Sequence, residues 1–258
     1  MFKKIFLVFL FLCFLLCGCK KKEAEIDDLQ QIMNRGKIIV GVRNDTAPFG
    51  FIDNNGNLCG LDIDLARHIA KIIFGDESKI EFVPVTASNR ISKLNSGEVD
   101  ILIATMSVTD QRQMVVRFTV PYYIAGQAIM VRSSSTATSL RDFRGKRLIV
   151  VYGSTSERNL RTNVPNVEVV GFKTYDEAFN ALKNGVAEGI VADDTILLAR
   201  AYTDKSLKIL PQRYSEEPYA VATRLEPEHS ILMTKLNYIL DNAQRTGKLR
   251  SLREKWGL

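Results

Sequence analysis

Short β-branched runs alternate with amphipathic segments along most of this 258-residue chain. The run over residues 37–42 (KIIVGV) is typical of a strand buried on both faces, as in parallel sheets. Further strands are expected over residues 80–85, 99–104, 147–151, 167–170 and 189–192, and helices over residues 66–73, 89–95, 175–183, 232–244 and 249–256. Such alternation predicts an α/β fold with mainly parallel sheets flanked by helices.

Two stretches of the chain echo each other at unequal spacing. Residues 94–102 (LNSGEVDIL) resemble residues 182–190 (LKNGVAEGI), and an Arg-Gly-Lys tripeptide precedes a strand at residue 35 and again at residue 144. Because the two offsets differ, the echoes are not those of a tandem repeat array. They favour two similar α/β lobes.

The N-terminus has the pattern of an export signal. Residues 1–4 form a short, positively charged segment. Residues 5–16 form an apolar run that is too short to span a bilayer comfortably as a helix. The segment LCGC that ends at Cys19 resembles the lipobox of bacterial lipoproteins, which implies cleavage after residue 18 and a lipid on Cys19. We therefore predict a signal peptide (1–18), a charged tether (19–27) and a membrane anchor at Cys19. An ordinary secretory signal, cut a few residues further on, is the alternative.

Charge and cysteine content exclude several classes of protein. The formal net charge of +6 is spread along the chain without the long basic runs of a nucleic-acid-binding surface. Cys59 is the only cysteine after Cys19, so we expect no internal disulfide. His68 and His229 have no metal-ligand spacing, so we expect neither a metal site nor a cofactor.

Five motifs stand in a fixed order along the exported chain. They are GVRNDTAPFGF (41–51), GLDIDLA (60–66), SVTDQR (107–112), FTVPYY (118–123) and GSTS (153–156). Together they resemble the polar amino-acid-binding proteins of ABC importers, solute-binding protein family 3, from about residue 28 to the terminal KWGL.

The resemblance implies a two-lobed periplasmic-binding-protein fold of type II, in which two hinge crossovers join the lobes and a ligand is clamped in the cleft. Lobe 1 would comprise residues 28–123 and 221–258, and lobe 2 residues 127–217. The family also implies an exported monomer, periplasmic or at the cell surface, that captures a free amino acid and passes it to the membrane permease of an ABC importer.

Arg112 is the main candidate for binding a carboxylate. It follows a helix start at residues 109–110, where its guanidinium could reach the cleft and form two parallel hydrogen bonds. The resemblance implies the same role, with the α-carboxylate of the ligand. Thr105 and Ser107 end the preceding strand and could offer a hydroxyl and a backbone N–H to the same ligand.

The second half of the chain offers further ligand-binding candidates. Thr155 and Ser156 follow a strand through a glycine turn into a helix N-terminus, a place suited to anions. Asp193 ends another strand, and the family match implies that it accepts the ligand's ammonium. Its neighbour Asp194 is better placed to cap the next helix.

Two further arginines bear on specificity. Binders of basic amino acids carry an acid at the position of Arg43, and the glutamate/aspartate-binding branch has an arginine at that of Arg90. Guanidinium groups beside Arg112 would repel it unless an anion arrives, so we expect a ligand with a second carboxylate. Tyr175 and Tyr219 also resemble that branch and could add hydroxyl contacts or apolar walls.

Structural interpretations compete with these assignments. Arg43 could pair at the surface with Asp45 or with an aspartate of the GLDIDLA motif. Arg90 could be a helix-surface residue, and Tyr175 could belong to the core of lobe 2. Glutamine, or another polar amino acid, is therefore the alternative ligand.

Thr46 departs from the family pattern. Many relatives have an aromatic residue at this position, which stacks on the aliphatic part of the ligand. In this chain Phe49 or Phe51 would have to supply that ring, or the pocket is more polar.

Other classes of function are compatible with the same fold. Some exported dehydratases share it, but an enzyme of that kind needs a cleft acid placed for proton transfer, and no motif in the sequence indicates one. A sensor would carry an appended transmembrane or kinase segment. An adhesin role stays open on sequence grounds. We predict binding without catalysis.

Overall fold

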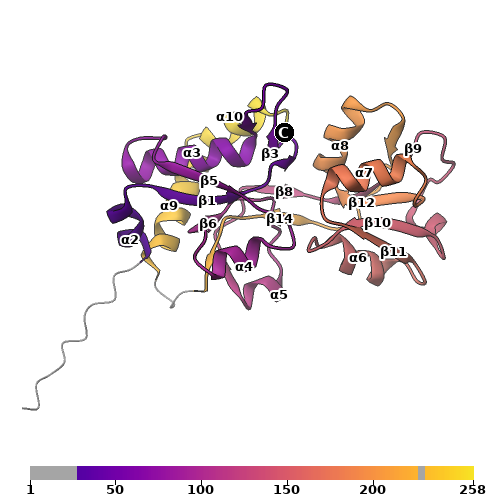
Figure 1. The fold of residues 1–258 in the computed structure, drawn as a ribbon, viewed down its shortest axis with the longest axis horizontal. Coiled ribbons are helices and arrows are strands. Elements are labelled where there is room, and N and C mark those ends of the chain that lie inside the picture. Colours follow the sequence, from indigo (N-terminus) through magenta and orange to yellow (C-terminus); the bar gives the residue numbers. More distant parts are fainter. Residues whose placement is uncertain (1–27, 226–229) are drawn as a thin grey trace, which may run out of the picture.

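The computed structural model describes residues 28–225 and 230–258. The predicted signal peptide, the tether and Cys19 lie outside the described residues. Figure 1 shows two lobes next to each other along the long axis, joined by two strands. None of the described helices is long and apolar enough to cross a membrane.

Lobe 1 is built around a five-stranded sheet in the order β5-β1-β6-β15-β7. Its strands are β1 (Ile38–Val42), β5 (Ile80–Pro84), β6 (Ile101–Leu102), β7 (Val116–Phe118) and β15 (Ala222–Arg224), and a small separate sheet contains β2 (Asp45–Thr46), β3 (Gly50–Ile52) and β4 (Leu58–Cys59). Its helices are α2 (Asp28–Arg35), α3 (Leu61–Phe74), α4 (Arg90–Asn95), α5 (Asp110–Gln113), α9 (Ile231–Arg245) and α10 (Lys248–Lys255).

Lobe 2 repeats this plan with a sheet in the order β11-β10-β12-β9-β13. Its strands are β9 (Gln127–Arg132), β10 (Arg147–Val151), β11 (Glu168–Phe172), β12 (Gly189–Asp193) and β13 (Leu207–Ile209). Its helices are α6 (Ser156–Asn163), α7 (Tyr175–Lys183) and α8 (Asp194–Thr203), preceded by a 3-10 turn over Leu140–Phe143.

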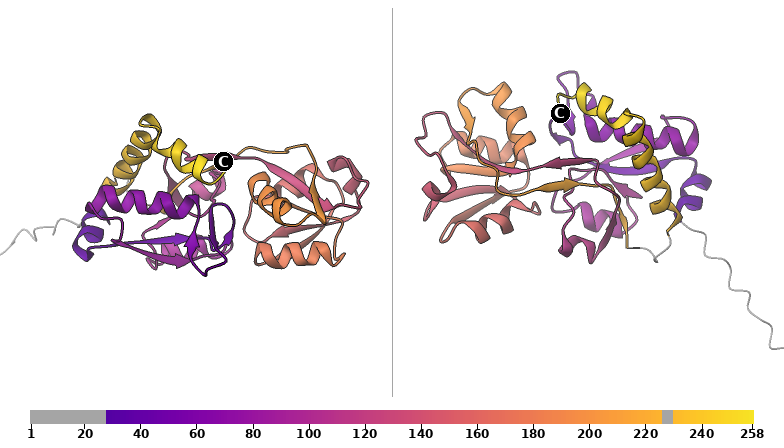
Figure 2. Two further views of the ribbon diagram at one scale, coloured as in Figure 1. Left: turned by 90° about the horizontal axis from the view of Figure 1, so that it is seen from above. Right: turned by 180° about the vertical axis from the view of Figure 1, so that it is seen from behind.

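Two short strands cross between the lobes. They are β8 (Tyr123–Ala125) and β14 (Glu217–Tyr219), which pair antiparallel with Tyr123 opposite Tyr219. The view from behind in Figure 2 shows both crossing from one lobe to the other. These two strands form the hinge.

Each large sheet is mixed rather than wholly parallel, and the hinge explains why. In lobe 1, β1 runs parallel to β5 and β6, whereas β15 runs antiparallel to β6 and β7. In lobe 2, β10 runs parallel to β11 and β12, whereas β9 runs antiparallel to β12 and β13. Since β9 and β15 each follow a hinge strand, they enter their sheet from the other lobe.

Buried apolar residues cover both faces of each sheet, as expected for helices packed on either side. In lobe 1 the alternating residues Ile38, Val40 and Val42 of β1 have no exposed surface and belong to the core under α3 and α9. A second cluster around Leu94 and Leu102 fills the other face. In the described part of lobe 2, two clusters likewise flank the sheet. These cores fix the strand ends that meet at the cleft.

Candidate functional site

A small cavity lies between the lobes. It is lined from lobe 1 by Arg43, Ala87, Arg90, Thr105, Ser107 and Arg112, and from lobe 2 by Ser154, Thr155, Tyr175 and Asp193. Of the residues predicted to bind a ligand, Ser156 and Tyr219 are the two that do not line it. The sequence did not single out Ala87 and Ser154, although both lie in segments that carry other candidates.

The two lobes touch each other around this cavity. The Arg112 Nη2 donates to the Gly153 carbonyl oxygen across the cleft at 3.0 Å. On the other side, the Tyr175 N–H donates to Asp45 Oδ2 at 3.4 Å, and the Arg43 guanidinium carbon lies 5.6 Å from the centre of the Tyr175 ring. The structure therefore represents a closed arrangement of the lobes.

Arg112 is held in place by the local structure of α5. Thr109 caps this helix, and its hydroxyl accepts the Arg112 backbone N–H at 3.2 Å. The Arg112 Nη1 donates to the Ser107 carbonyl oxygen at 2.7 Å. Burial lowers the pKa of the Arg112 guanidinium, whereas the charges of Glu217 and Asp193 act to raise it. Two of its five N–H donors are used by carbonyls of the two lobes, and others are available for a carboxylate.

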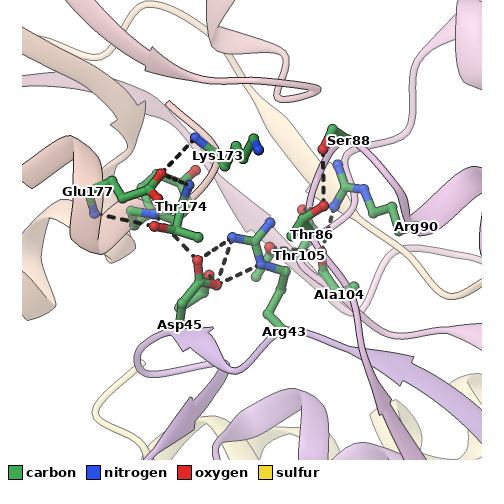
Figure 3. Close-up of polar contacts among 12 residues, drawn as sticks. Arg43, Asp45, Thr86, Ser88, Arg90, Ala104, Thr105, Lys173, Thr174 and Glu177 are labelled. Carbon is green, nitrogen blue, oxygen red and sulfur yellow. Dashed lines mark hydrogen bonds and ion pairs between the residues drawn. The ribbon is translucent and has the colours of Figure 1, made fainter. Parts of the chain in front are cut away.

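Arg90 is a buried cation and not a helix-surface residue. Its exposed fraction is 3%, and its Nη1 donates to the carbonyl oxygens of Ala104 at 2.6 Å and Thr105 at 3.3 Å (Figure 3). Its Nε has no hydrogen-bond partner, and no carboxylate of the described residues forms an ion pair with it. Burial, followed by the charges of Arg112 and Arg43, holds the pKa of the Arg90 guanidinium well below its usual range.

Arg43 already has an anionic partner. Its Nε and Nη2 donate to the two carboxylate oxygens of Asp45 at 2.8 and 2.7 Å, the bidentate arrangement that suits a guanidinium. Figure 3 shows Asp45 between Arg43 and the start of α7 at Thr174. The alternative of pairing with Asp45 is therefore observed, but in a buried site, because Arg43 is 1% exposed. The sequence analysis expected an anionic ligand to compensate the charge of Arg43. In the structure Asp45 already does so.

Asp193 ends β12 at the lobe 2 wall of the cavity and accepts a hydrogen bond from the Tyr219 hydroxyl. Burial raises the pKa of Asp193 to about 7, with a further contribution from the charge of Glu217. Tyr219 is fully buried and does not line the cavity, and its hydroxyl contacts Asp193. Asp194, predicted to cap the next helix, is instead the first residue of α8. Its carboxylate accepts the Thr195 N–H at 2.7 Å.

The turn before α6 has Thr155, but not Ser156, in the cavity wall. The Thr155 hydroxyl donates to Glu217 Oε2 at 2.7 Å. Ser156 is the first residue of α6 and is 1% exposed, with its place in the cavity wall taken by Ser154. The Ser154 hydroxyl donates to the Val151 carbonyl oxygen at 2.7 Å. Ser154 and Thr155 directly precede the first residue of α6, and both line the cavity.

Thr105 has an unusual backbone conformation that a buried acid supports. Its φ is 46°, in the left-handed region that most residues with a Cβ avoid. Its N–H donates to Asp62 Oδ2 at 3.0 Å, and the Tyr122 hydroxyl donates to Asp62 Oδ1 at 2.8 Å. Burial raises the pKa of Asp62 to about 6. Asp62 was not predicted as a site residue. It does not line the cavity itself, but it binds the backbone of Thr105, which does.

Among the described residues that line the cavity, Tyr175 alone is aromatic. It also stacks on Phe179 of the lobe 2 core, with ring centres 6.1 Å apart, so Tyr175 belongs to that core and lines the cavity as well. Phe49 does not replace the ring missing at Thr46, because it packs between Tyr123 and Tyr219 beside the hinge, 5.3 Å from each ring. Phe51 packs against the C-terminal tryptophan instead.

No group of three or more metal-ligating side chains comes together in the part of the chain that the structure describes. The residues that line the cavity supply three guanidinium groups, one carboxylate and several hydroxyl and backbone groups. Both lobes contribute to this set.

Comparison with known proteins identifies the family. A sequence model of the bacterial extracellular solute-binding proteins, family 3, matches residues 38–258. The chain belongs to this family. The predicted family and the two-lobed fold are thereby confirmed.

Individual family 3 proteins resemble the chain over most of its length. It is 36% identical over 267 residues to the ABC transporter glutamine-binding protein GlnH of Bacillus subtilis, covering 98% of this chain and 97% of that protein. It is 39% identical to a glutamine-binding protein of Geobacillus stearothermophilus, covering 82% of each. A solved structure of an ancestral arginine-binding protein bound to glutamine is 39% identical, with a TM-score of 0.80 over 86% of this chain and 98% of that one.

Proposed function

We propose that this extracellular solute-binding protein captures a free acidic amino acid, glutamate or aspartate, by closure of its lobes and delivers it to the membrane permease of an ABC importer. The proposal of an acidic ligand rests on Arg90. This residue is a buried cation in the cavity wall, and its hydrogen-bond partners are two backbone carbonyls. A buried charge is costly unless an opposite charge is close.

The cavity offers one group for each charge of such a ligand. Arg112 would bind the α-carboxylate with the donors that it does not use on carbonyls. Asp193 would accept the α-ammonium from lobe 2. Because Asp45 neutralises Arg43, Arg90 is the cation that a second carboxylate would compensate. A ligand held in this way touches both lobes and so stabilises the closed form.

Glutamine is the second candidate, and particular observations favour it. Two relatives are named as glutamine-binding proteins, and a related structure contains glutamine. The ion pair between Arg43 and Asp45 also removes one of the two cations on which the acidic preference was based. The amide oxygen of glutamine could accept a hydrogen bond from Arg90, but it would bring no charge opposite to that of the guanidinium.

Titration calorimetry on ligand-stripped protein separates the two candidates, because glutamate and glutamine are nearly isosteric. We expect glutamate or aspartate to bind at least about tenfold more tightly than glutamine, which corresponds to about 1.4 kcal/mol. The Arg90→Leu variant should lose most of its affinity for glutamate and little of its affinity for glutamine.

Lys93→Gln is the matched control for Arg90→Leu. It removes a positive charge from the same helix α4, where the Lys93 ammonium pairs with Glu98 outside the cavity. Its selectivity should equal that of the wild type. A wild-type protein that prefers glutamine, or equal losses of both ligands in Arg90→Leu, would refute the acidic assignment.

We further infer that the protein binds its ligand without transforming it. Asp193 is the one carboxyl group among the described residues of the cavity wall, and its raised pKa would suit proton transfer. However, Tyr219 donates to this carboxylate and the ligand ammonium needs an acceptor, so we assign it to binding. Mass spectrometry of the ligand after prolonged incubation with the protein should recover it unchanged.

The export and anchoring signals lead to a separate proposal, which rests on the sequence alone. We infer that Cys19 is the lipidated N-terminus of the mature protein and tethers it to a membrane. The wild type should then partition with membranes, and Cys19→Ala should release or mislocalise it. Mass spectrometry that finds an unacylated N-terminus several residues after Cys19 would overturn this proposal.

A further inference from the structure

The hinge strand β14 sends two buried side chains into lobe 2. Glu217 and Tyr219 are two residues apart, so they lie on the same face of the strand, and both are almost fully buried. Tyr219 donates to Asp193 at the end of β12, whereas Glu217 contacts the beginning of α6. The hinge therefore contacts the lobe 2 wall of the cavity at two places.

The Glu217 carboxylate accepts hydrogen bonds from three side chains. The Thr155 hydroxyl donates to Oε2 at 2.7 Å, and Ser215 Oγ and Asn159 Nδ2 donate to Oε1 at 2.7 and 3.1 Å. Gln127 at the start of β9 completes the network, because its Nε2 donates to the Thr155 hydroxyl at 2.8 Å. Thr155 lines the cavity, and its single hydroxyl hydrogen is committed to Glu217.

The negative charge of Glu217 is not neutralised by an ion pair with any described residue. It therefore acts on the other charges nearby. Asp193 is also influenced by Asp194 of α8, Arg112 of α5 and the Tyr219 hydroxyl, and its charge in turn affects Tyr175 of α7. After burial, the charge of Glu217 is the largest influence that raises the pKa of Asp193. A like charge nearby favours the protonated form of a carboxyl group.

We propose that Glu217 is a positioning residue of the ligand site, which holds Thr155 in the cavity wall and places a negative charge on the same face of β14 as Tyr219, the residue that contacts Asp193. Its charge then acts on Asp193, the acceptor proposed for the ligand's ammonium. The proposal rests on the role of Asp193 in the proposed function. It does not depend on the side chain of the ligand, since every free amino acid carries the ammonium.

The sign of the pH dependence follows from the state of Asp193 that binds. The ammonium pairs with the ionised carboxylate, whose pKa in the closed cavity is about 7. Affinity should therefore be full above that pH and should fall as the pH decreases through it. Removing the Glu217 charge should move this fall to lower pH.

The test is titration calorimetry over about pH 5.5–8.5, performed separately with glutamine and glutamate. Glu217→Gln keeps an oxygen acceptor for Thr155 but removes the charge. We expect its affinity at the upper end of the range to stay within about threefold of the wild type. The midpoint of its pH dependence should be lower by about one unit.

Two further variants separate charge from position. Glu217→Asp keeps the charge but is too short to hold Thr155, so affinity should fall several-fold at every pH while the midpoint stays in place. Glu216→Gln removes a neighbouring exposed charge and should behave as the wild type at every pH. Thermal melts establish that each variant is folded, and Glu217→Asp supplies the positional result if Glu217→Gln does not fold.

A Glu217→Gln profile that superimposes on the wild type, or an equal shift in Glu216→Gln, would overturn the proposal. A wild-type affinity that is independent of pH over the same range would do so as well. These outcomes are distinct from failure of the acidic assignment, which is judged by whether glutamate or glutamine binds more tightly at one pH.

Discussion

Replacing Arg112 by alanine should weaken binding of every amino acid by about 2–4 kcal/mol, because the ligand's α-carboxylate loses its charged partner in a closed cavity. The loss should be similar for glutamate and glutamine, since both have the same α-carboxylate. The variant also loses the hydrogen bond from Arg112 to the Gly153 carbonyl, which joins the two lobes. Titration calorimetry measures the loss directly.

Two control variants show whether the effect comes from geometry or from net charge. Arg112→Lys keeps the charge but not the planar fork of donors, and we expect it to recover only part of the affinity. Arg161→Ala removes a positive charge from the exposed face of α6, where Arg161 pairs with Glu157, and it should bind as the wild type does. Wild-type affinity in Arg112→Ala, within about threefold, would show that Arg112 is outside the site.

Replacing Gly153 by alanine should prevent full closure of the lobes. A Cβ at this position would lie 2.6 Å from the Ala87 carbonyl oxygen and 2.7 Å from the Ser88 Cα, both backbone atoms of the other lobe. Such overlap costs about 1–3 kcal/mol and is present only in the closed form. We therefore expect ligand affinity to fall at least about tenfold, and small-angle scattering to show less compaction on addition of ligand.

Gly145 provides the matched control within the same lobe. Both glycines have positive φ, 77° at Gly153 and 68° at Gly145, so alanine strains the backbone at either position. Apart from its two chain neighbours, no described residue has an atom within 4 Å of a Cβ built on Gly145. Gly145→Ala should therefore lower the thermal stability but leave the affinity unchanged. An equal loss of affinity in both variants would show that backbone strain, not contact between the lobes, is responsible.

The sequence predicted the order of the elements and much of the site, because both depend on local patterns. The strand over residues 147–151 and the helix over residues 175–183 have the predicted bounds. The capping signal at Thr109 correctly marks the start of α5. Strand ends set by such signals place the residues that follow them at the cleft, which is why most of the predicted site residues line the cavity.

Side-chain partners that depend on tertiary packing could not be predicted from the sequence. Arg43 had several possible partners, and only the fold shows that Asp45 reaches its guanidinium inside the protein. The role of Glu217 was not predicted, although its position two residues before Tyr219 on a strand implies that both side chains lie on the same face. Asp62 was assigned to a motif but not to the site, because its contact with Thr105 joins residues far apart in the chain.

A crystal structure of the protein with glutamate tests the central claim most directly. We expect the ligand between the lobes, with its α-carboxylate on Arg112, its ammonium on Asp193 and its side-chain carboxylate within hydrogen-bond distance of Arg90. A glutamate whose side chain points away from Arg90, or whose α-carboxylate is bound by groups other than Arg112, would contradict the account.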